Sequence, residues 1–382
     1  MKTIMLKIMN KRFLGFIILV IVIGFFLVGL WPFNFIPENE VKWLKNTTGI
    51  SFYGHGMIHT SDHLNGGNPP FQNGSITVEV LLQPKLNCDC FIARILSLHD
   101  GRKVENLIIG QWKDDLVLGG YIIKPDKNKK YKEVGPGNIL IRDKKIFITI
   151  TSGNDGTTVY IDGKEIRSYP QYSLIYDNKS SGYLIIGSSP IGKQNWTGEL
   201  YGLAIYNRII APDQVLNNYH AWIKNGSPDT LGEESPLALY LFDEKSGPTV
   251  KNHSGQQDLM IPEKFTPFKR VILTAPWQDF KLDRSYLKDV VINFFGFIPF
   301  GFFFIALLWN PIESKRLRTS ILVILTGGGL SLIIELIQSN IPTRTSSLTD
   351  LILNTLGTVA GVILFNMISG KRGNQDHPTY LR

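Results

Sequence analysis

The chain has only two cysteines, Cys88 and Cys90, among its 382 residues. So few cysteines exclude a zinc centre built from cysteines alone, because such a centre takes about four ligands. The sequence leaves two states open for the pair: a strained Cys-x-Cys disulfide or two half-buried thiols. None of the nearby histidines has a recognisable ligand spacing with the pair, and these are His55, His59, His63 and His99.

Three of these histidines, His55, His59 and His63, recur every four residues, a spacing that would align them on one face of a helix. The glycine and aromatic residues around them favour strand and loop instead. We therefore predict no metal site here.

The sequence also lacks a glycine-rich phosphate loop and a recognisable nucleophile motif. Its net charge of +8 is not spread as a nucleic-acid-binding stripe would be. The basic residues instead gather beside long apolar runs, which is typical of membrane topology. We expect no cofactor and no nucleic-acid partner.

Four apolar runs are long enough to cross a bilayer, at residues 13–30, 290–309, 319–337 and 351–368. A hydrocarbon core of ~30 Å needs about 20 helical residues. The first run could instead be a cleaved signal peptide, since it follows a basic start. It is long for that role, however, and it ends in Leu30-Trp31-Pro32-Phe33 rather than at a small-residue cleavage site. We favour a retained helix.

Clusters of basic residues predict how these helices are oriented. They lie before the first run, between the second and third, and after the fourth: Lys2, Lys7, Lys11 and Arg12, then Lys315, Arg316 and Arg318, then Lys371 and Arg372. Cytoplasmic loops are enriched in Lys and Arg. All three clusters therefore agree with four spans, both termini inside, and residues from about 37 to 288 outside.

The polar middle of the chain shows short β-type runs separated by Gly, Asn, Asp and Pro, for example at 75–80, 107–110, 146–151 and 183–187. The segment 146–164 is the clearest, with one turn predicted at 152–156 and a second at Asp162-Gly163. Many short strands with frequent turn signals favour an all-β sandwich.

Two segments of this region resemble a known family. They are Tyr160-Ile161-Asp162-Gly163-Lys164 with its hairpin, and 196–208, which precedes a short helix expected at 211–215. Both are similar to the LamG-type, concanavalin A-like lectin/glucanase domains, which implies a jelly-roll sandwich. The segment 237–247 resembles the strand that commonly opens such domains, although here it comes last. Placed next to the first strand, it would close the same fold.

Related glucanases carry a Glu-x-Asp-x-x-Glu triplet on one strand, and this sequence has none. Glu79 stands alone on its predicted strand. We therefore expect no glycosidase activity from the external domain. Two interpretations stay open: it binds a glycan or a protein, or it is purely structural.

The second and fourth apolar runs share a pattern of polar and small residues. A constant offset of 61 separates the members of each pair, since 350 − 289, 354 − 293 and 357 − 296 are equal: Asp289 with Asp350, Asn293 with Asn354, and Gly296 with Gly357. Steps of four and three residues place each set on one helix face. We expect each Asp to begin its helix, and the small residues, including Gly357-x3-Gly361, to let helices approach closely.

The third run adds Ser331, Glu335 and Gln338 at the same spacing, and Arg344 follows in a short loop. Ionisable groups in a span favour a functional site, while hydrogen bonding between helices is the structural alternative. We predict one binding site at the outer end of the bundle, with no catalytic or metal-binding residue assigned. Its members are Asp289, Asn293, Ser331, Glu335, Gln338, Arg344, Asp350 and Asn354.

These residues, with Gly296-Phe297-Ile298-Pro299-Phe300-Gly301, resemble the pattern of the VanZ-like membrane family. The resemblance implies a multidomain protein: a four-helix transmembrane bundle whose first external loop is expanded by an all-β jelly-roll sandwich. The expected parts are a first helix with a basic cytoplasmic start at 1–36, the sandwich at 37–262, a linker at 263–288, three helices at 289–370, and a cytoplasmic tail at 371–382.

The leading hypothesis is a binding protein in the cytoplasmic membrane of a bacterium. Its sandwich would engage a glycan or protein of the cell envelope, and its helices a membrane lipid or lipid-linked envelope precursor. The resemblance associates such proteins with glycopeptide resistance or envelope homeostasis. The alternative is an intramembrane enzyme acting on an envelope lipid or lipid-linked precursor, with Glu335 or an Asp as base. A structural partner of another membrane protein is the third interpretation.

Overall fold

The computed structural model forms two compact units, residues 1–35 with 270–382, and residues 36–269. It describes residues 10–64, 71, 74–86, 91–101, 105–123, 131–175, 182–229, 235–255, 257–280, 284–309 and 316–370. The expectations for Cys88 and Cys90, for Lys315 and for the tail at 371–382 lie outside the described residues.

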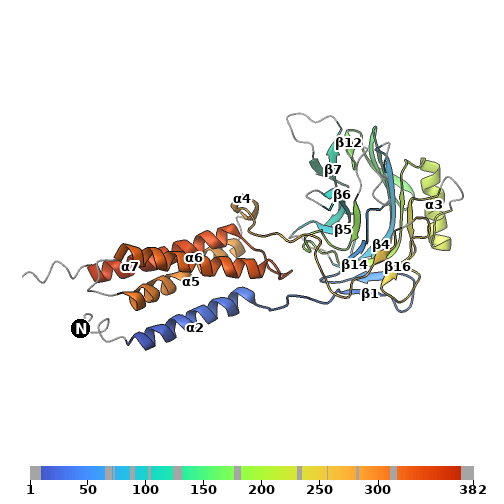
Figure 1. The fold of residues 1–382 in the computed structure, drawn as a ribbon. Helices are drawn as coiled ribbons and strands as arrows, with labels where there is room; N and C mark the ends of the chain where they lie inside the picture. The colour runs from blue at the N-terminus through green and yellow to red at the C-terminus, as the bar shows by residue number, and fades with distance from the viewer. Residues whose placement is uncertain are drawn as a thin grey trace, which may run out of the picture. The chain divides into compact units, whose positions relative to one another are not determined.

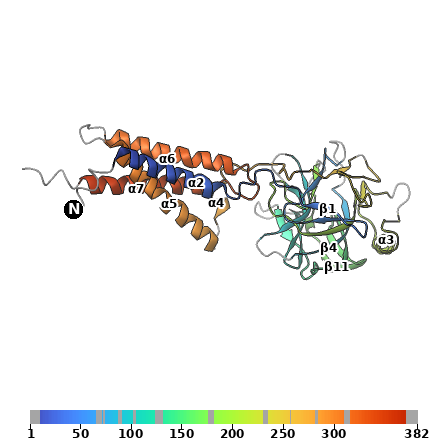
Figure 2. The same cartoon turned by 90° about the horizontal axis from the view of Figure 1, so that it is seen from below.

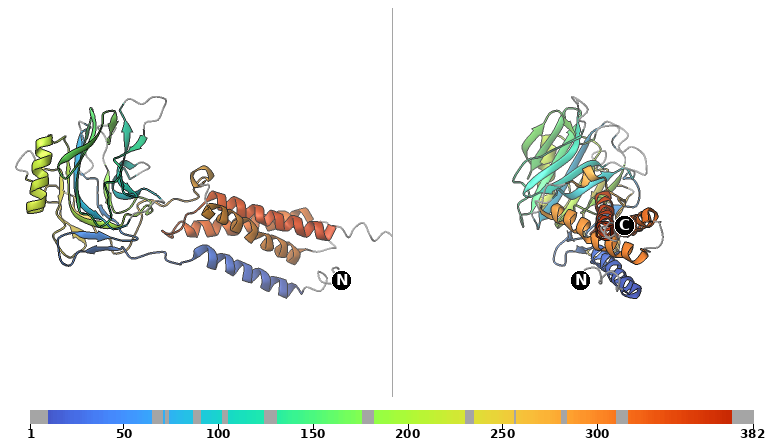
Figure 3. Two further views of the ribbon diagram at one scale, coloured as in Figure 1. Left: turned by 180° about the vertical axis from the view of Figure 1, so that it is seen from behind. Right: turned by 90° about the vertical axis from the view of Figure 1, so that its left-hand side faces the viewer.

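The first unit is a bundle of four long helices, α2 (Lys11–Leu30), α5 (Arg284–Leu308), α6 (Arg316–Gln338) and α7 (Leu348–Gly370), with the short α4 (Pro276–Asp279) before α5. Within the described residues, all four long helices are long and apolar enough to cross a membrane. Figure 2 shows them side by side, and α2 begins at the end of the bundle where α7 ends (Figure 3). The predicted bundle is confirmed.

Helices α5 and α7 run parallel and touch through glycines. A Cβ atom added at Gly357 would lie 2.1 Å from the carbonyl oxygen of Phe294, and one at Gly361 would lie 2.2 Å from that of Ile298. On α5 the close approach uses Gly301, whose added Cβ would lie 2.2 Å from the Thr358 carbonyl oxygen. Gly296 has no atom within 4 Å of its added Cβ, so the expectation of close packing there is wrong.

The second unit is a sandwich of two antiparallel sheets. In the described residues, one sheet has the order β1 (Val41–Trp43), β2 (Ile50–Phe52), β14 (Gly198–Tyr206), β4 (Ile76–Pro84), β9 (Ile146–Gly153), β10 (Gly156–Ile161) and β11 (Lys164–Tyr169), with β15 (Ala238–Tyr240) also on β14. The other has the order β12 (Tyr172–Ser173), β7 (Asp115–Ile122), β6 (Glu105–Trp112), β5 (Ala93–His99), β13 (Tyr183–Ile186), β3 (Ile58–Thr60), β17 (Leu259–Met260) and β16 (Thr249–Val250), with β8 (Tyr131–Val134) on β7. The predicted β-sandwich is confirmed.

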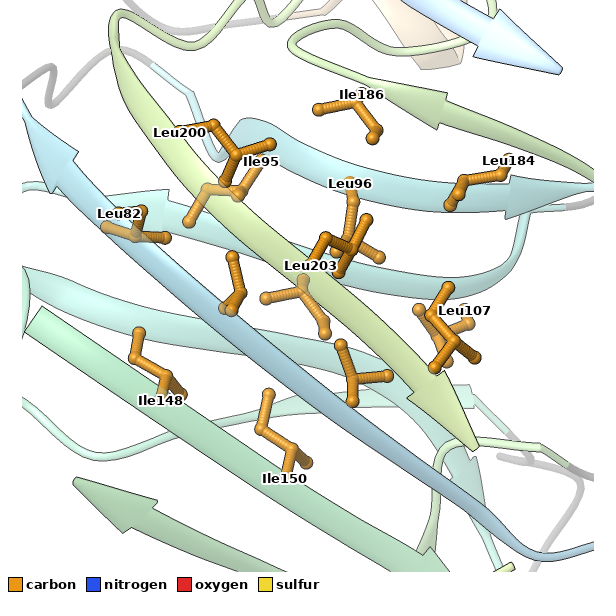
Figure 4. Close-up of a cluster of buried hydrophobic side chains, with 14 of the residues drawn as sticks. Leu82, Ile95, Leu96, Leu107, Ile148, Ile150, Leu184, Ile186, Leu200 and Leu203 are labelled. Atoms are coloured by element: carbon orange, nitrogen blue, oxygen red, sulfur yellow. The ribbon is translucent and has the colours of Figure 1, made fainter. Parts of the chain in front are cut away.

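Aliphatic side chains from the two sheets meet between them and form the core (Figure 4). On β9, for example, Ile148 and Ile150 are fully buried and separated by one residue, the spacing at which side chains share a face of a strand. Leu184 and Ile186 follow the same rule on β13 of the opposite sheet. Figure 1 shows the two sheets as facing layers.

The hairpin between β10 and β11 has the predicted turn. Asp162 and Gly163 both adopt positive φ, 50° and 77°, as a two-residue type I′ turn requires. His59 lies in β3, which agrees with strand rather than helix at the histidine series.

The late strand β15 pairs with β14 in line with β2, rather than directly with the first strand. The Gly49 N–H donates to the carbonyl of Phe242, two residues after β15, and links this part of the chain to the first hairpin. β15 thus pairs along the part of the β14 edge that β2 leaves unpaired.

Helix α3 (Pro212–Asn225) covers the outer face of the β4 and β14 sheet (Figure 1). Its Trp222 is buried against this face, where Gly202 leaves room for the ring: a Cβ atom added at Gly202 would lie 2.1 Å from the indole. Pro212 starts the helix, as expected from the sequence, and Gly226 ends it in a left-handed conformation.

The segments that enter and leave the sandwich pair with each other. The Asn39 amide donates to the carbonyls of Met57 and Pro262 and accepts from the Met57 N–H. The Phe265 N–H donates to the Pro37 carbonyl, and the Phe265 ring is buried against Met57. Because these contacts close the base of the sandwich, the folded unit extends beyond residue 262.

We therefore predict that a fragment of residues 36–269 is soluble, gives β-type circular dichroism, and depends on Phe265. Phe265→Ala should lower its free energy of unfolding by about 3 kcal/mol, since the ring is buried. Tyr53→Ala, at a side chain that is 68% exposed, is the control and should change it by less than about 0.5 kcal/mol. Urea denaturation measures both, and equal effects would contradict the closing role of residues 262–269.

Candidate functional site

Asp289, one of the two polar residues of α5 in the predicted site, faces away from α7. Helix α5 already runs from Arg284, so Asp289 lies within the helix, and the expectation that it begins the helix is wrong. At 100° per residue, Asp289 is turned by about 140° from Phe294, which faces α7. Asp289 is exposed, and within the described residues neither it nor Asn293 hydrogen-bonds to another member of the predicted site.

Glu335 is buried near the C-terminal end of α6 and fixes the start of α7. Its Oε2 accepts a hydrogen bond of 2.7 Å from the Ser347 N–H. Ser347 Oγ in turn accepts from the backbone N–H groups of Thr349 and Asp350. Ser347 is therefore the N-cap of α7, and Asp350, expected to begin this helix, is its third residue. Glu335 plays the part that the acidic residue of a capping box plays within one helix.

The remaining backbone donor at the start of α7 is the Leu348 N–H, and its acceptor lies in the segment before α5. It donates to the Thr274 carbonyl at 3.0 Å, while the Thr274 N–H donates to the Ser346 carbonyl at 2.8 Å. All N–H groups from Ser347 to Asp350 thus have acceptors. Because lipid supplies none, this pairing is what the end of a transmembrane helix requires.

The C-terminus of α2 is held by the side chains of Arg344 and Gln338. Arg344 donates from Nε to the Trp31 carbonyl at 2.8 Å and from Nη2 to the Val28 carbonyl at 3.1 Å. Gln338 Nε2 donates to the Gly29 carbonyl at 2.8 Å. A guanidinium at a helix C-terminus both hydrogen-bonds the free carbonyls and complements the negative end of the helix dipole.

Deeper in the bundle, Asn354 of α7 donates to Ser331 Oγ of α6 at 2.9 Å. Two amide oxygens nearby are buried without a hydrogen-bond partner in the described part of the chain, Oδ1 of Asn354 and Oε1 of Gln338. Each is an acceptor that a donor group of a ligand could satisfy.

The structure thus connects Ser331 with Asn354, and Glu335 with the helix start that contains Asp350. It brings Gln338 and Arg344 to α2 instead. Sequence reasoning missed Thr274, Ser346 and Ser347. Ser347-x-x-Asp350 before an apolar run is a capping-box signature that could have identified the N-cap, whereas no sequence signal identifies Thr274, which comes from the expected linker.

The sandwich contains a buried carboxylate that sequence reasoning left without a role. Glu79 on β4 is fully buried and accepts hydrogen bonds from Tyr206 Oη at 3.0 Å, Asn218 Nδ2 at 2.8 Å and Trp222 Nε1 at 3.0 Å. Burial raises the pKa of Glu79 above its ordinary value, and these hydrogen bonds partly oppose that shift. Asn218 and Trp222 belong to α3, so Glu79 fastens this helix to the sheet.

A group of possible metal ligands lies near the last strands of the sandwich. Oxygen or nitrogen atoms of Asp243, Glu244 and His253 all lie within 4.8 Å of one another, although Asp243 and His253 are exposed. Glu244 Oε1 accepts from the Lys251 N–H. Sequence reasoning missed this group because β15 and the turn after it bring His253 back to Asp243.

The raised pKa of Glu79 predicts a specific pH dependence. The folded state binds this proton more tightly than the unfolded chain, so the contribution to stability is present below about pH 4 and is lost as the pH rises through the folded-state pKa. Glu79→Gln should remove this loss. Between about pH 4 and pH 7 the 36–269 fragment should lose stability relative to the variant, as urea denaturation at each pH measures.

Glu165→Gln, at an exposed carboxylate of β11, is the matched control and should leave the pH profile unchanged. Glu79→Ala should destabilise the fragment by about 3 kcal/mol, because it leaves three buried donors without an acceptor. If the free energy of unfolding changed with pH in the same way in the natural sequence and in Glu79→Gln, the pH dependence could not come from Glu79.

A second prediction concerns Arg344. A Cβ atom added at Gly29 would lie 3.0 Å from Ile334 Cγ2, so cysteines at positions 29 and 334 should form a disulfide in the full chain with Cys88 and Cys90 changed to serine. Arg344→Ala should reduce the yield of this disulfide several-fold, because the carbonyls of Val28 and Trp31 lose the hydrogen bonds that hold the end of α2. Arg318→Ala, at an exposed arginine of α6, is the control. Equal yields in both variants would show that Arg344 does not hold α2.

Two family models match the chain. Residues 237–369 match the VanZ/LLP1 model, and residues 59–216 match the model of the concanavalin A-like lectin/glucanases superfamily. The VanZ/LLP1 match begins at the last strands of the sandwich and continues through α7. A search of curated proteins found no match.

Solved structures similar to the chain include the following three. One is a candidate carbohydrate-binding protein from Bacteroides ovatus (15% identity, TM-score 0.41, 58% of this chain and 59% of that chain). Another is the native heptameric SAP-like pentraxin of Limulus polyphemus (14%, TM-score 0.35, 59% and 94%). A third is the binding domain of botulinum neurotoxin DC in complex with rat synaptotagmin II (15%, TM-score 0.35, 48% and 45%).

The chain thus spans 59% of the length of the Bacteroides ovatus protein. Likeness at these identities concerns the fold alone. Taken with the four apolar helices and the two antiparallel sheets, the family matches show that the chain is a membrane protein that joins a VanZ-like region to a concanavalin A-like, LamG-type sandwich.

Proposed function

We propose that this protein displays a binding domain on the outside of a bacterial cytoplasmic membrane, where the sandwich binds a glycan or a protein of the cell envelope. The observation that carries the proposal is the concanavalin A-like sandwich, a compact unit with its own core and a closed base. The role is recognition rather than hydrolysis, because the glucanase carboxylate triplet is absent from the sequence.

The proposed location of the sandwich outside the cell rests on the basic residues at the helix ends. Lys11 and Arg12 lie at the start of α2, and Arg316 and Arg318 at the start of α6. Helices α2 and α6 each begin at the end of the bundle where α7 ends, and Lys371 follows there in the sequence. Since cytoplasmic ends are enriched in Lys and Arg, both termini lie inside and residues 37–288 outside.

Cysteine labelling of intact cells tests this orientation, in a chain with Cys88 and Cys90 changed to serine. An impermeant maleimide should label Thr343→Cys, in the loop between α6 and α7, and should fail to label Lys315→Cys until the cells are opened. The reverse pattern would contradict the orientation.

The membrane helices, in this proposal, engage a lipid or a lipid-linked envelope precursor. The support is the pair of buried acceptors without partners in the described residues, Asn354 Oδ1 and Gln338 Oε1, close to the outer end of the bundle. Glu335 favours binding over catalysis, because its Oε2 holds the backbone of α7. A link to glycopeptide resistance or envelope homeostasis is part of the same proposal.

The test of the external domain uses the full chain in lipid nanodiscs and a matched chain in which a Gly/Ser linker replaces residues 41–260. Each is applied to an array of envelope glycans and to solubilised envelope proteins. The full chain should retain a defined glycan or protein that the shortened chain does not. Retention by neither chain, or equal retention by both, would refute the proposal.

The test of the membrane helices identifies the lipids that copurify with the full chain by mass spectrometry. A defined lipid should copurify unchanged with the natural sequence and with Glu335→Gln, whose side-chain oxygen still accepts from the Ser347 N–H. Turnover of that lipid by the natural sequence but not by Glu335→Gln would establish the alternative, an intramembrane enzyme.

A further inference from the structure

The segment immediately before α5 is part of the membrane unit. Besides the two backbone hydrogen bonds of Thr274, the Leu273 N–H donates to Ser346 Oγ at 3.1 Å. Arg270 also donates to the side-chain oxygen of Asn340. The segment is therefore fixed to the loop between α6 and α7, at the end of the bundle where α2 ends and α5 begins.

Three large apolar side chains of this fixed segment are exposed: Ile272 by 54%, Trp277 by 80% and Phe280 by 60%. Scattered apolar side chains are normal on a protein surface. These three lie within nine residues, however, on a backbone that is held in place and that includes the short helix α4. A fixed apolar segment next to a transmembrane bundle needs a partner for its exposed surface.

The exposed side chains continue into the surface of the spans. The Phe280 ring meets that of Tyr286, the first residue of the second span, with centroids 5.6 Å apart. Leu287 and Val291 of the same helix are 54% and 52% exposed. At the end of α2, Trp31 and Phe33 are also exposed, and Arg344 fixes that end to the same loop.

We propose that residues 271–280 form an interfacial segment, with Ile272, Trp277 and Phe280 seated in the headgroup region of the outer leaflet. The occupant of this surface is phospholipid, because the surface is continuous with helix faces that lipid must cover. Tryptophan and other amphipathic rings favour this depth, where one edge is apolar and the other reaches water. By holding residues 271–280 at the interface, lipid would keep the Thr274 carbonyl on the first turn of α7.

Site-directed spin labelling tests the depth directly. A nitroxide is placed at position 277 or 280 of the full chain, with Cys88 and Cys90 changed to serine, in vesicles of phosphatidylcholine and phosphatidylglycerol. Collision with oxygen and with a water-soluble nickel chelate is measured by power saturation. Two exposed positions serve as references, Tyr53 in the sandwich and Leu325 in the middle of α6. Thermal unfolding of each labelled chain checks that the fold is unchanged.

The ratio of oxygen to nickel accessibility at 277 and 280 should be several-fold higher than at 53 and several-fold lower than at 325, which places both side chains in the headgroup region. A ratio equal to that at 53 would place the segment in water and overturn the proposal. A ratio equal to that at 325 would place it in the hydrocarbon core and would also overturn it. Low accessibility to both reagents would show that protein covers the surface, either the sandwich or a second copy.

Discussion

The free backbone groups at helix ends, which lipid cannot satisfy, are the constraint on which the membrane unit depends. An α-helix leaves four N–H groups and four carbonyls without partners, and each costs several kcal/mol in hydrocarbon if it stays unpaired. At the start of α7, Ser347, Glu335 and Thr274 supply acceptors for consecutive donors. At the end of α2, Arg344 and Gln338 supply donors for the carbonyls of Val28, Gly29 and Trp31. Polar residues of three segments thereby fix two helix ends.

These hydrogen bonds at the helix ends change the interpretation of the polar residues. The sequence predicted correctly that α6 and α7 carry polar side chains near one end, because their spacing of four and three residues is a helix spacing. It could not predict their partners. Arg344 was predicted to belong to a binding site with the polar residues of the helices, but its described hydrogen bonds go to backbone carbonyls of α2 and Trp31. Asp289 shares the spacing of Asp350 yet faces away from α7, since spacing along one helix does not determine which face meets a neighbour.

The sandwich was easier to predict than the bundle contacts. Alternation of apolar residues along 146–151 and the Asp162-Gly163 turn define β9, β10 and β11 locally, so the sequence identified them. The position of β15 depends on which edge of β14 is free, and the role of Glu79 depends on Asn218 and Trp222, more than 130 residues away. Such pairings are set by tertiary packing, and a single sequence contains no local signal for them.

Amide hydrogen exchange at the start of α7, in lipid nanodiscs, tests the central claim most directly. In the natural sequence, the N–H groups from Ser347 to Asp350 should exchange slowly, and Glu335→Gln should preserve this protection because its side-chain oxygen still accepts from Ser347. Glu335→Leu should accelerate exchange of the Ser347 N–H by about fivefold or more, because it leaves this buried donor without an acceptor at a cost of ~1–3 kcal/mol. Rapid exchange in the natural sequence, or equal protection in Glu335→Leu, would contradict the account.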